Sequence, residues 1–595
     1  MDGDQSSALL RGLTAAQRAA VISDAAPLCV LAGAGSGKTT VLTRRVARRI
    51  FDGSASAEHS LVLTFTRKAS RELRERLWHL QTPGRVWAGT FHAAAYGQLR
   101  RHWSDAGLRP LGLLDDPGRL LRRTGRPGTE PLSGETARAV LAEIQWAQAR
   151  LVSPETYAAA ASAGARRTPL PVEETAEAFR RYEQAKRSHG LIDLNDLLIR
   201  CAELIEHDPA VAAACHWRIR HLYVDEFQDL NPAQWRLLTA WLGPRSDLFV
   251  VGDPRQAVYG WNGADPTLLD RLPDLLAGTR VLRLDANHRS SPQVIAAARA
   301  VLRSSGLASS AREPTLEPSG PVGEGAGGIG SAGRPDGPVP EVSGFADEAE
   351  EANALARWLR RMHRPGRPWS HLAVLARTNS RLTPIAAGLD RAGIPFRIGP
   401  SRAGEEMKAV MDLLRSDTLG RPLRSALADL SLPGIPPVLA RLADEHAVEE
   451  PGASVGGFLS WLSATVADGT TSETDPAADV VELSTFHRAK GLEWPAVALI
   501  GLEDGLVPIS YADTPAARSE EHRLLYVAIT RAEERLWCSW SGQRQAGDRV
   551  RASRPSPLLA AIEAAGRPAP STADAESFAA QMAALRRRLP AATPA

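Results

Sequence analysis

A glycine-rich segment near the amino terminus has the residue types that bind the phosphates of a nucleotide. Residues 32–39 read AGAGSGKT and continue the apolar run PLCVLAG at 27–33. A strand followed by glycines and then by a helix lets backbone N–H groups surround phosphate oxygens, and a Cβ would block that approach. Lys38 is predicted to bridge the β- and γ-phosphates, and the Thr39 hydroxyl to ligate Mg²⁺. The predicted phosphate loop consists of Ala32, Gly33, Ala34, Gly35, Ser36, Gly37, Lys38, Thr39 and Thr40.

Two adjacent carboxylates follow a second apolar run. In HLYVDEFQD, residues 221–229, Asp225 is placed to hold Mg²⁺ through water, and Glu226 to polarise an attacking water molecule. A carboxylate pair at a strand end could instead cap a helix. The two motifs alone also leave open a kinase that transfers phosphate to a small acceptor. A water-activating glutamate directly after the metal-binding aspartate favours hydrolysis.

Short apolar runs predict the sheet that positions these residues. Buried parallel strands are predicted by the runs at 27–33, 61–66, 221–226 and 247–253. After the glycine loop, Leu42, Val46 and Ile50 recur at i, i+4 and i+8, which places one apolar stripe on a helix. After the acidic pair, Asn231 is placed to cap a helix that begins at Pro232.

The same pattern returns in the second half of the chain, without a second phosphate loop. Its runs lie at 371–377, 480–487, 495–502 and 535–541. We therefore expect an α/β protein with two parallel-sheet domains, each with a mostly helical insertion. The expected boundaries are 1–100 plus 196–283 for the first domain, 101–195 for its insertion, 284–415 plus 480–560 for the second domain, 416–479 for its insertion and 561–595 for a tail. The glycine- and proline-rich stretch 303–345 is expected to be a mobile connector.

Length and composition fit a globular protein of several domains. The chain has 595 residues, 44% of them hydrophobic and 23% charged, and a formal net charge of only +3. Local patches and backbone donors would therefore have to hold any anionic partner. Four scattered cysteines argue against a zinc module and a disulfide framework, and the absence of a long apolar run argues against a membrane span. We expect a cytoplasmic protein.

From about residue 10 to 560, the chain resembles the UvrD/Rep/PcrA family of superfamily 1 DNA helicases, motif after motif and in the same order. The matching segments are LTAAQRAAV, AGAGSGKTT, TFTRKASRELRERL, GTFHAAA, DEFQD, VVGDPRQAVYGWNGAD, LDANHRSS, ELSTFHRAKGLEWPAV and EEHRLLYVAITRAEERL. The resemblance implies two RecA-like P-loop-type domains with ATP bound between them. It also implies movement 3′ to 5′ on single-stranded DNA, action on 3′-tailed duplexes, and work as a monomer or weak oligomer.

The resemblance assigns further residues to sites. Those near ATP would be Gln17 for the adenine, Gln256 for the γ-phosphate, His288, Arg289, Glu493 for the ribose, and Arg531. The DNA contacts would be Phe65, Thr90, His92, Tyr259, Trp261, Thr485 and His487. An arginine that reaches ATP from the opposite domain can contribute about 10³ or more in rate, so ATP would complete the interface and pull the domains together. Bases would stack on the aromatic side chains, which tolerates any sequence.

Some residues depart from the family pattern. Ala32 replaces the first glycine of the loop, His288 a tyrosine that stacks on adenine, and Asn262 an arginine after the stacking aromatic. The second insertion, about 60 residues long, is too small for the usual duplex-contacting subdomain. This favours, as one alternative, a translocase that does not open duplexes. An alternative of another class is a P-loop protein that is not a motor, whose ATPase activity would ignore DNA. The residues do not decide between DNA and RNA.

Overall fold

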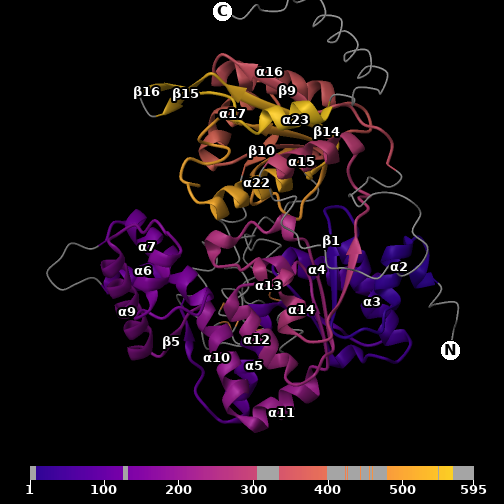
Figure 1. The fold of residues 1–595 in the computed structure, drawn as a ribbon. Helices are drawn as coiled ribbons and strands as arrows, with labels where there is room; N and C mark the ends of the chain where they lie inside the picture. The colour runs from indigo at the N-terminus through magenta and orange to yellow at the C-terminus, as the bar shows by residue number, and fades with distance from the viewer. Residues whose placement is uncertain are drawn as a thin grey trace, which may run out of the picture.

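The computed structural model describes residues 8–114, 116–124, 132–304, 334–398, 479–546 and 549–566, together with the single positions 423, 425, 443, 455, 458 and 459. Two parallel sheets organise these residues. Figure 1 shows the second sheet and its helices above the first, with a helical insertion beside the first domain. The expected fold class, two parallel-sheet domains of RecA-like type, is confirmed.

The first sheet has the strand order β3-β2-β6-β7-β1-β8, with all neighbouring strands parallel. Its strands are β1 (Leu28–Ala32), β2 (Ser60–Thr64), β3 (Trp87–Thr90), β6 (His221–Val224), β7 (Leu248–Gly252) and β8 (Arg280–Leu284). All four strands predicted for this domain are present, whereas β3 and β8 were not predicted. In β8, two arginines interrupt the apolar residues and only Leu284 is buried, so the strand lacks the continuous apolar run of the central strands.

Helices cover both faces of the first sheet, because successive residues of a buried strand point to opposite sides. Cys29 packs against one layer and Val30 against the other. One layer consists of α2 (Ala15–Ile22), α3 (Lys38–Phe51) and α4 (Arg67–His79). The other consists of α5 (Phe91–Asp105), α10 (Leu194–His207), α11 (Pro209–Arg218), α12 (Pro232–Leu242), α13 (Thr267–Asp270) and α14 (Leu272–Leu275). The predicted start of α12 is confirmed, since Asn231 caps it and Pro232 is its first residue.

The second sheet has the strand order β11-β12-β10-β13-β14-β9, again with all neighbouring strands parallel. Its strands are β9 (Glu341–Phe345), β10 (Leu372–Ala376), β11 (Phe396–Ile398), β12 (Val481–Thr485), β13 (Trp494–Ile500) and β14 (Ala532–Ser541). One face packs on α16 (Glu348–Met362) and α17 (Asn379–Arg391), and the other on α15 (Pro292–Ser304), α22 (Pro515–Ile529) and α23 (Leu559–Gly566). A hairpin of β15 (Gln543–Ala546) and β16 (Arg549–Ala552) extends from β14.

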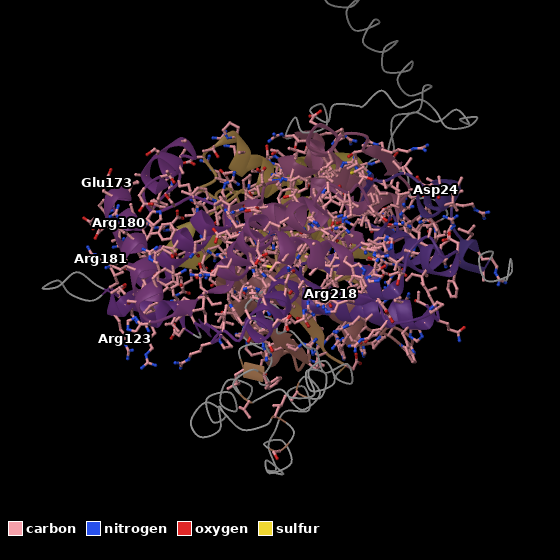
Figure 2. The ribbon with its side chains drawn as sticks, turned by 90° about the horizontal axis from the view of Figure 1, so that it is seen from below. Asp24, Arg123, Glu173, Arg180, Arg181 and Arg218 are labelled. Atoms are coloured by element: carbon pink, nitrogen blue, oxygen red, sulfur yellow. The ribbon has the colours of Figure 1, made fainter. Side chains whose placement is uncertain are left out.

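The insertion in the first domain is helical, with its own small core. It contains α6 (Pro117–Arg123), α7 (Gly134–Ala149), α8 (Tyr157–Ala163) and α9 (Val172–Ser188), and it is tied to the domain by β4 (Gly112–Leu113) paired with β5 (Leu191–Ile192). Figure 2 shows Glu173, Arg180 and Arg181 of α9 on its outer rim. The expected boundary at residue 101 falls inside α5, which continues to Asp105.

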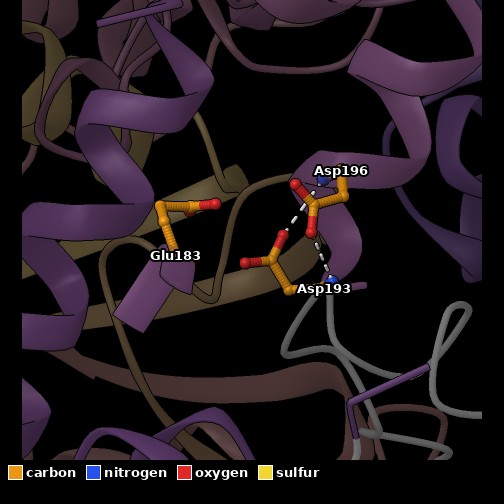
Figure 3. A group of neighbouring side chains, drawn as sticks. All are labelled: Glu183, Asp193 and Asp196. Atoms are coloured by element: carbon orange, nitrogen blue, oxygen red, sulfur yellow. Dashed lines mark hydrogen bonds between the residues drawn. The ribbon is translucent and has the colours of Figure 1, made fainter. Parts of the chain in front are cut away.

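An acidic cluster in this insertion is a structural ion network. Glu183, Asp193 and Asp196 converge as Figure 3 shows, and their geometry could hold a cation. The Lys186 ammonium occupies that position, with Nζ 2.9, 2.6 and 2.8 Å from the three carboxylates respectively. Asp193 and Asp196 also form the capping box of α10. The lysine thus neutralises the cluster and links α9 to α10.

Two expected boundaries need correction. The expected connector 303–345 ends in β9, whose five residues pair with β14 along their whole length, so that part of the prediction was wrong. The expected tail from 561 begins inside α23, which packs on α15 through Ile562. The second insertion, 416–479, lies almost wholly outside the described residues. In the described part of the chain, no helix is long and apolar enough to cross a membrane.

Candidate nucleotide site at the domain interface

The predicted phosphate loop joins β1 to α3 and is shaped by glycines. Gly35 and Gly37 have φ of +67° and +83°, a region that favours glycine, and Gly37 directly precedes the first turn of α3. The Ser36 hydroxyl donates to the Gly33 carbonyl at 2.8 Å, which closes the turn. Gln17 donates from Nε2 to the Ser36 carbonyl at 2.9 Å, so α2 braces the loop. This strand, turn and helix N-terminus match the requirements of a phosphate cradle.

The carboxylate pair lies beside this loop. Lys38 Nζ is 3.2 Å from Glu226 Oε2, and Glu226 has φ +51°, which turns the chain sharply after β6. Burial raises the pKa of Asp225, and the adjacent Glu226 raises it further. Burial also opposes ionisation of Glu226, but Lys38 and Lys490 outweigh it and lower the pKa of that carboxyl. Glu226 is therefore the ionised partner of Lys38.

The residues predicted to hold Mg²⁺ fit a hard divalent cation. Asp225 ends β6, and Thr39 lies in the first turn of α3, next to Lys38. Their carboxylate and hydroxyl oxygens are the donor types that Mg²⁺ prefers. The raised pKa of Asp225 has a neighbouring carboxylate as one of its causes, and a divalent cation would relieve that repulsion.

Hydrogen bonds connect Glu226 to the next strand of the sheet. Gln228 donates from Nε2 to Glu226 Oε2 at 2.7 Å and accepts at Oε1 from the Asp253 backbone N–H at 2.8 Å. Asp253 in turn accepts from Gln256 Nε2 at 2.8 Å. Gln228 and Gln256 are buried. The Gln228 side chain and the backbone and side chain of Asp253 therefore connect Glu226 to Gln256.

The second domain touches the phosphate loop directly through residues 287–289. Asn287 Nδ2 donates to the Ala34 carbonyl at 2.6 Å, and the His288 N–H donates to the Gly35 carbonyl at 2.8 Å. A Cβ on Gly35 would lie 2.6 Å from Asn287 Nδ2 and 2.7 Å from the Cβ of Arg289. Arg289 forms an ion pair with Glu493. The structure thus brings Arg289 and Glu493 together at the loop, with Arg289 against Gly35.

Arg531 lies just past the end of α22 and is almost fully buried. Its guanidinium donates to the carbonyls of Val527 and Leu492 at 2.8 and 3.0 Å and to the Thr530 hydroxyl at 3.1 Å. Burial lowers the pKa of Arg531 to about 9, and Arg289 lowers it as well, while Glu226 acts in the opposite direction. Arg531 therefore lies within electrostatic reach of both Arg289 and the first-domain carboxylate Glu226.

An ion pair crosses the interface close to this site. Lys490 Nζ lies 2.5 Å from Asp229 Oδ2 and donates to the Gln256 carbonyl at 2.7 Å. Both charged side chains are more than nine-tenths buried. Burial raises the pKa of Asp229 to about 6 even though Lys490 opposes the shift. Lys490 therefore ties the second domain to two segments that follow β6 and β7.

Most of the residues predicted to contact DNA lie along the same interface or at the adjoining sheet edge. Trp261 is 55% exposed, and its ring lies 6.2 Å from that of His487 and 6.5 Å from that of Tyr259. Burial, Arg377 and Lys490 lower the pKa of His487 to about 4, so its ring is neutral near pH 7. Thr485 ends β12, two residues before His487. Three aromatic rings from both domains therefore gather at the interface.

The other predicted DNA contacts follow neighbouring strands of the first sheet. Phe65 comes directly after β2 and contacts Phe91 with ring centroids 5.9 Å apart. Thr90 ends β3 and its hydroxyl caps α5, and His92 is in the first turn of that helix. Because β2 and β3 are parallel neighbours, these residues lie at the same sheet edge as Asp225. Thr90 and His92 are both buried, and the structural role that the contacts show is that of the Thr90 hydroxyl as the cap of α5.

Comparison with known proteins places the chain in a family. Residues 13–276 match the UvrD/REP helicase N-terminal domain, and residues 449–543 the UvrD-like helicase C-terminal domain. The chain is 37% identical to the ATP-dependent DNA helicase UvrD2 of Mycobacterium tuberculosis (strain H37Rv), with 95% of this chain and 84% of that protein covered. The chain belongs to the UvrD/REP helicase family.

More distant members of the UvrD/REP family are also similar over most of their length. DNA helicase II of Escherichia coli K12 is 26% identical, with 93% of this chain and 87% of that protein covered. The ATP-dependent DNA helicase PcrA of Leuconostoc citreum is 26% identical, with 93% and 85% covered. The predicted family resemblance is thereby confirmed.

Sequence reasoning missed several residues of this UvrD-like interface. Gln228 and Asp229 lie inside the DEFQD segment, and Lys490 lies inside RAKGLEW. The segments were recognised as motifs, but the contacts of these three residues were not predicted. Asn287 and Glu520 were missed because their partners are backbone groups of the other domain. No local sequence pattern predicts a hydrogen bond between a side chain and the backbone of another domain.

Proposed function

We propose that this chain is an ATP-dependent, Mg²⁺-requiring DNA helicase that moves 3′ to 5′ along single strands and opens 3′-tailed duplexes. It would serve DNA repair, replication or recombination, in the cytoplasm and as a monomer or weak oligomer. The relatives named as DNA helicases support this proposal, and the polarity rests on the family resemblance.

One observation carries the proposal. The loop around Lys38 and the carboxylate Glu226 belong to one sheet, while Asn287, Arg289 and Arg531 approach them from the other. A triphosphate bound at Lys38 would make favourable contacts with both domains only when they are closed. Ligands that bind one arrangement better shift the population toward it, so ATP would favour closure and hydrolysis would release it.

Each residue has a role that follows from its surroundings. Lys38 would leave Glu226 to meet the phosphates, which frees an ionised carboxylate to polarise water. Arg289 and Arg531 would stabilise charge that develops on the γ-phosphate, and Gln256 would register its presence through Asp253 and Gln228. Mg²⁺, held by Thr39 and Asp225, would neutralise phosphate charge. Gln17, His288 and Glu493 would bind the nucleoside.

DNA would pass over the aromatic group at the interface. Trp261 is the exposed member, with Tyr259 and His487 beside it. Stacking on such side chains contributes about 1 to 3 kcal/mol per base without reading sequence. Thr485 of the second domain and Phe65, Thr90 and His92 of the first would contact the same strand. Closure and opening of the domains would then move the protein along it.

A second candidate function is translocation on single strands without duplex opening. The length of the second insertion favours it, because about 60 residues give little room for a duplex-contacting subdomain.

Two assays test the proposal. ATP hydrolysis is measured with single-stranded DNA, RNA and duplex in parallel, and single-stranded DNA should accelerate it many-fold. Displacement of a labelled strand is then compared for 3′-tailed and 5′-tailed duplexes. Turnover that ignores DNA would contradict the motor function. Stimulated turnover without displacement of the 3′-tailed duplex would leave the translocase, and displacement from 5′ tails alone would reverse the polarity.

A further inference from the structure

The short loop between Gln256 and Trp261 belongs to the first domain in sequence but is bound along its backbone by the second. Lys490 donates to the Gln256 carbonyl at 2.7 Å, and Arg523 Nε donates to the Ala257 carbonyl at 2.8 Å. Glu520 accepts at Oε1 from the Gly260 N–H at 3.1 Å. Gly260 begins the 3₁₀ turn Gly260–Asn262, which carries Trp261. Three charged side chains of the second domain therefore bind three backbone groups of this loop.

The fit around Glu520 is close. A Cβ on Gly260 would lie 2.6 Å from Glu520 Oε2, so the carboxylate can approach this backbone only because residue 260 is a glycine. Backbone N–H donors to an ionised carboxylate form charge-assisted bonds, which are stronger than those between neutral groups. Burial raises the pKa of Glu520, while Arg523 and the backbone N–H groups of Gly260 and Trp261 favour its ionised form.

Two of these side chains share one helix with residues of the nucleotide site. Glu520, Arg523 and Tyr526 recur every three residues along α22, a spacing that places them on one face. Figure 1 shows α22 on the side of the second domain that faces the first. The Tyr526 hydroxyl meets the backbone of Ala34 in the phosphate loop, and Arg531 follows the end of the helix. The helix α22, which extends about 14 Å from Glu520 to its end, thus contacts both the phosphate loop and the loop that carries Trp261.

We propose that Glu520 is a positioning residue that couples the nucleotide site to the base-stacking side chain Trp261. When nucleotide at the phosphate loop changes the position of α22 and Arg531, the Glu520 carboxylate changes the position of the Gly260–Asn262 turn. This turn then sets the orientation of the Trp261 ring. Glu520 does not touch ATP in this account. The inference rests on the proposed function, in which Trp261 stacks on DNA and ATP closes the domains.

The test compares basal and DNA-stimulated ATP turnover of the full chain. Glu520→Ala should keep basal turnover and lose about tenfold of the stimulation by a single-stranded oligonucleotide, since a hydrogen bond to a charged group is lost. Glu520→Gln keeps an oxygen that accepts from Gly260, so it should stay within about threefold of wild type. Ser519→Ala, on the same helix, is the matched control and should leave the stimulation unchanged.

Two further variants test the same contact if Glu520→Ala folds poorly. Gly260→Ala displaces the carboxylate from the other side of the contact and should reproduce the loss of stimulation. In a double-mutant cycle, Glu520→Ala should add little to Trp261→Ala, because both act through the same ring. Additive effects, or wild-type stimulation in Glu520→Ala or Gly260→Ala, would overturn the coupling role. A wild-type rate that ignores DNA would instead refute the proposed function, and the coupling role with it.

Discussion

Replacing Glu226 with glutamine separates the two tasks assigned to its carboxylate. In the structure this carboxylate is the ion-pair partner of Lys38 at 3.2 Å, and Gln228 holds it from the other side. Glutamine preserves shape but removes the charge that polarises water. Because general-base groups contribute about 10²- to 10⁴-fold, DNA-stimulated turnover should fall by about 10³.

The same change should not weaken ATP binding. At 3.2 Å and an effective dielectric constant of about 20, the attraction between Lys38 and Glu226 is about 5 kcal/mol before desolvation. Because the Glu226 side chain is 26% exposed, the net value is nearer to about 1 kcal/mol. ATP must overcome this attraction to recruit Lys38, so its removal should tighten ATP binding by up to about fivefold.

The assay pairs two measurements on one preparation. Phosphate release at saturating ATP and single-stranded DNA gives turnover, and the fluorescence of a labelled ATP analogue gives the dissociation constant. Glu206→Gln, which removes a charge from a surface pair with Arg236 in the same domain, is the matched control and should change neither. Turnover within tenfold of wild type, or ATP binding weakened tenfold, would refute these roles of Glu226.

Three other predictions concern the interface. Lys490→Met leaves Asp229 buried without its partner, which should lower the free energy of unfolding by about 3 to 5 kcal/mol and sharply reduce DNA-stimulated turnover. Adding Asp229→Asn should restore part of that turnover. A double variant no more active than Lys490→Met would contradict the pairing. The pKa of His487 is depressed to about 4, so the folded protein resists protonation of this ring. Its contribution to the free energy of unfolding is therefore complete above about pH 6.5 and is lost as the pH falls toward 4. Thermal unfolding should show this loss in wild type and less of it in His487→Asn. Gly35→Ala should abolish turnover through backbone strain and a clash with the second domain. Gly53, with φ +78° and open space around it, is the matched control, and Gly53→Ala should show only the modest cost of backbone strain. Similar turnover in both variants would argue against closure at the loop.

Local patterns predicted much of the first domain. The start of α12 at Pro232, with Asn231 as its cap, follows from residues next to each other in sequence, and so does the phosphate loop. Edge strand β8 was missed because two arginines interrupt its apolar residues and only Leu284 is buried, which removes the continuous apolar signal. Strand β9 was missed because it follows a glycine-rich stretch and is held by its pairing with the distant β14.

The candidate site was predictable where chemistry follows residue type. Lys38 and Glu226 belong to motifs whose residue types indicate phosphate binding and water activation. In the structure, Lys38 Nζ lies 3.2 Å from Glu226 Oε2. Glu520 and Asn287 are different, because each binds a backbone group of the opposite domain. Such contacts depend on how two domains meet, which no local pattern encodes.

The most direct test of a nucleotide site shared by two moving domains is the distance between those domains. All four native cysteines are buried, so labels will react selectively with cysteines introduced at the exposed positions Asp24 and Asp390, one in each domain. Pulsed electron paramagnetic resonance then gives the distribution of distances between the two labels. A non-hydrolysable ATP analogue with single-stranded DNA should narrow this distribution to one short distance, and its removal should restore a broader and longer one. An unchanged distribution, under conditions in which nucleotide binding is measured independently, would contradict the account.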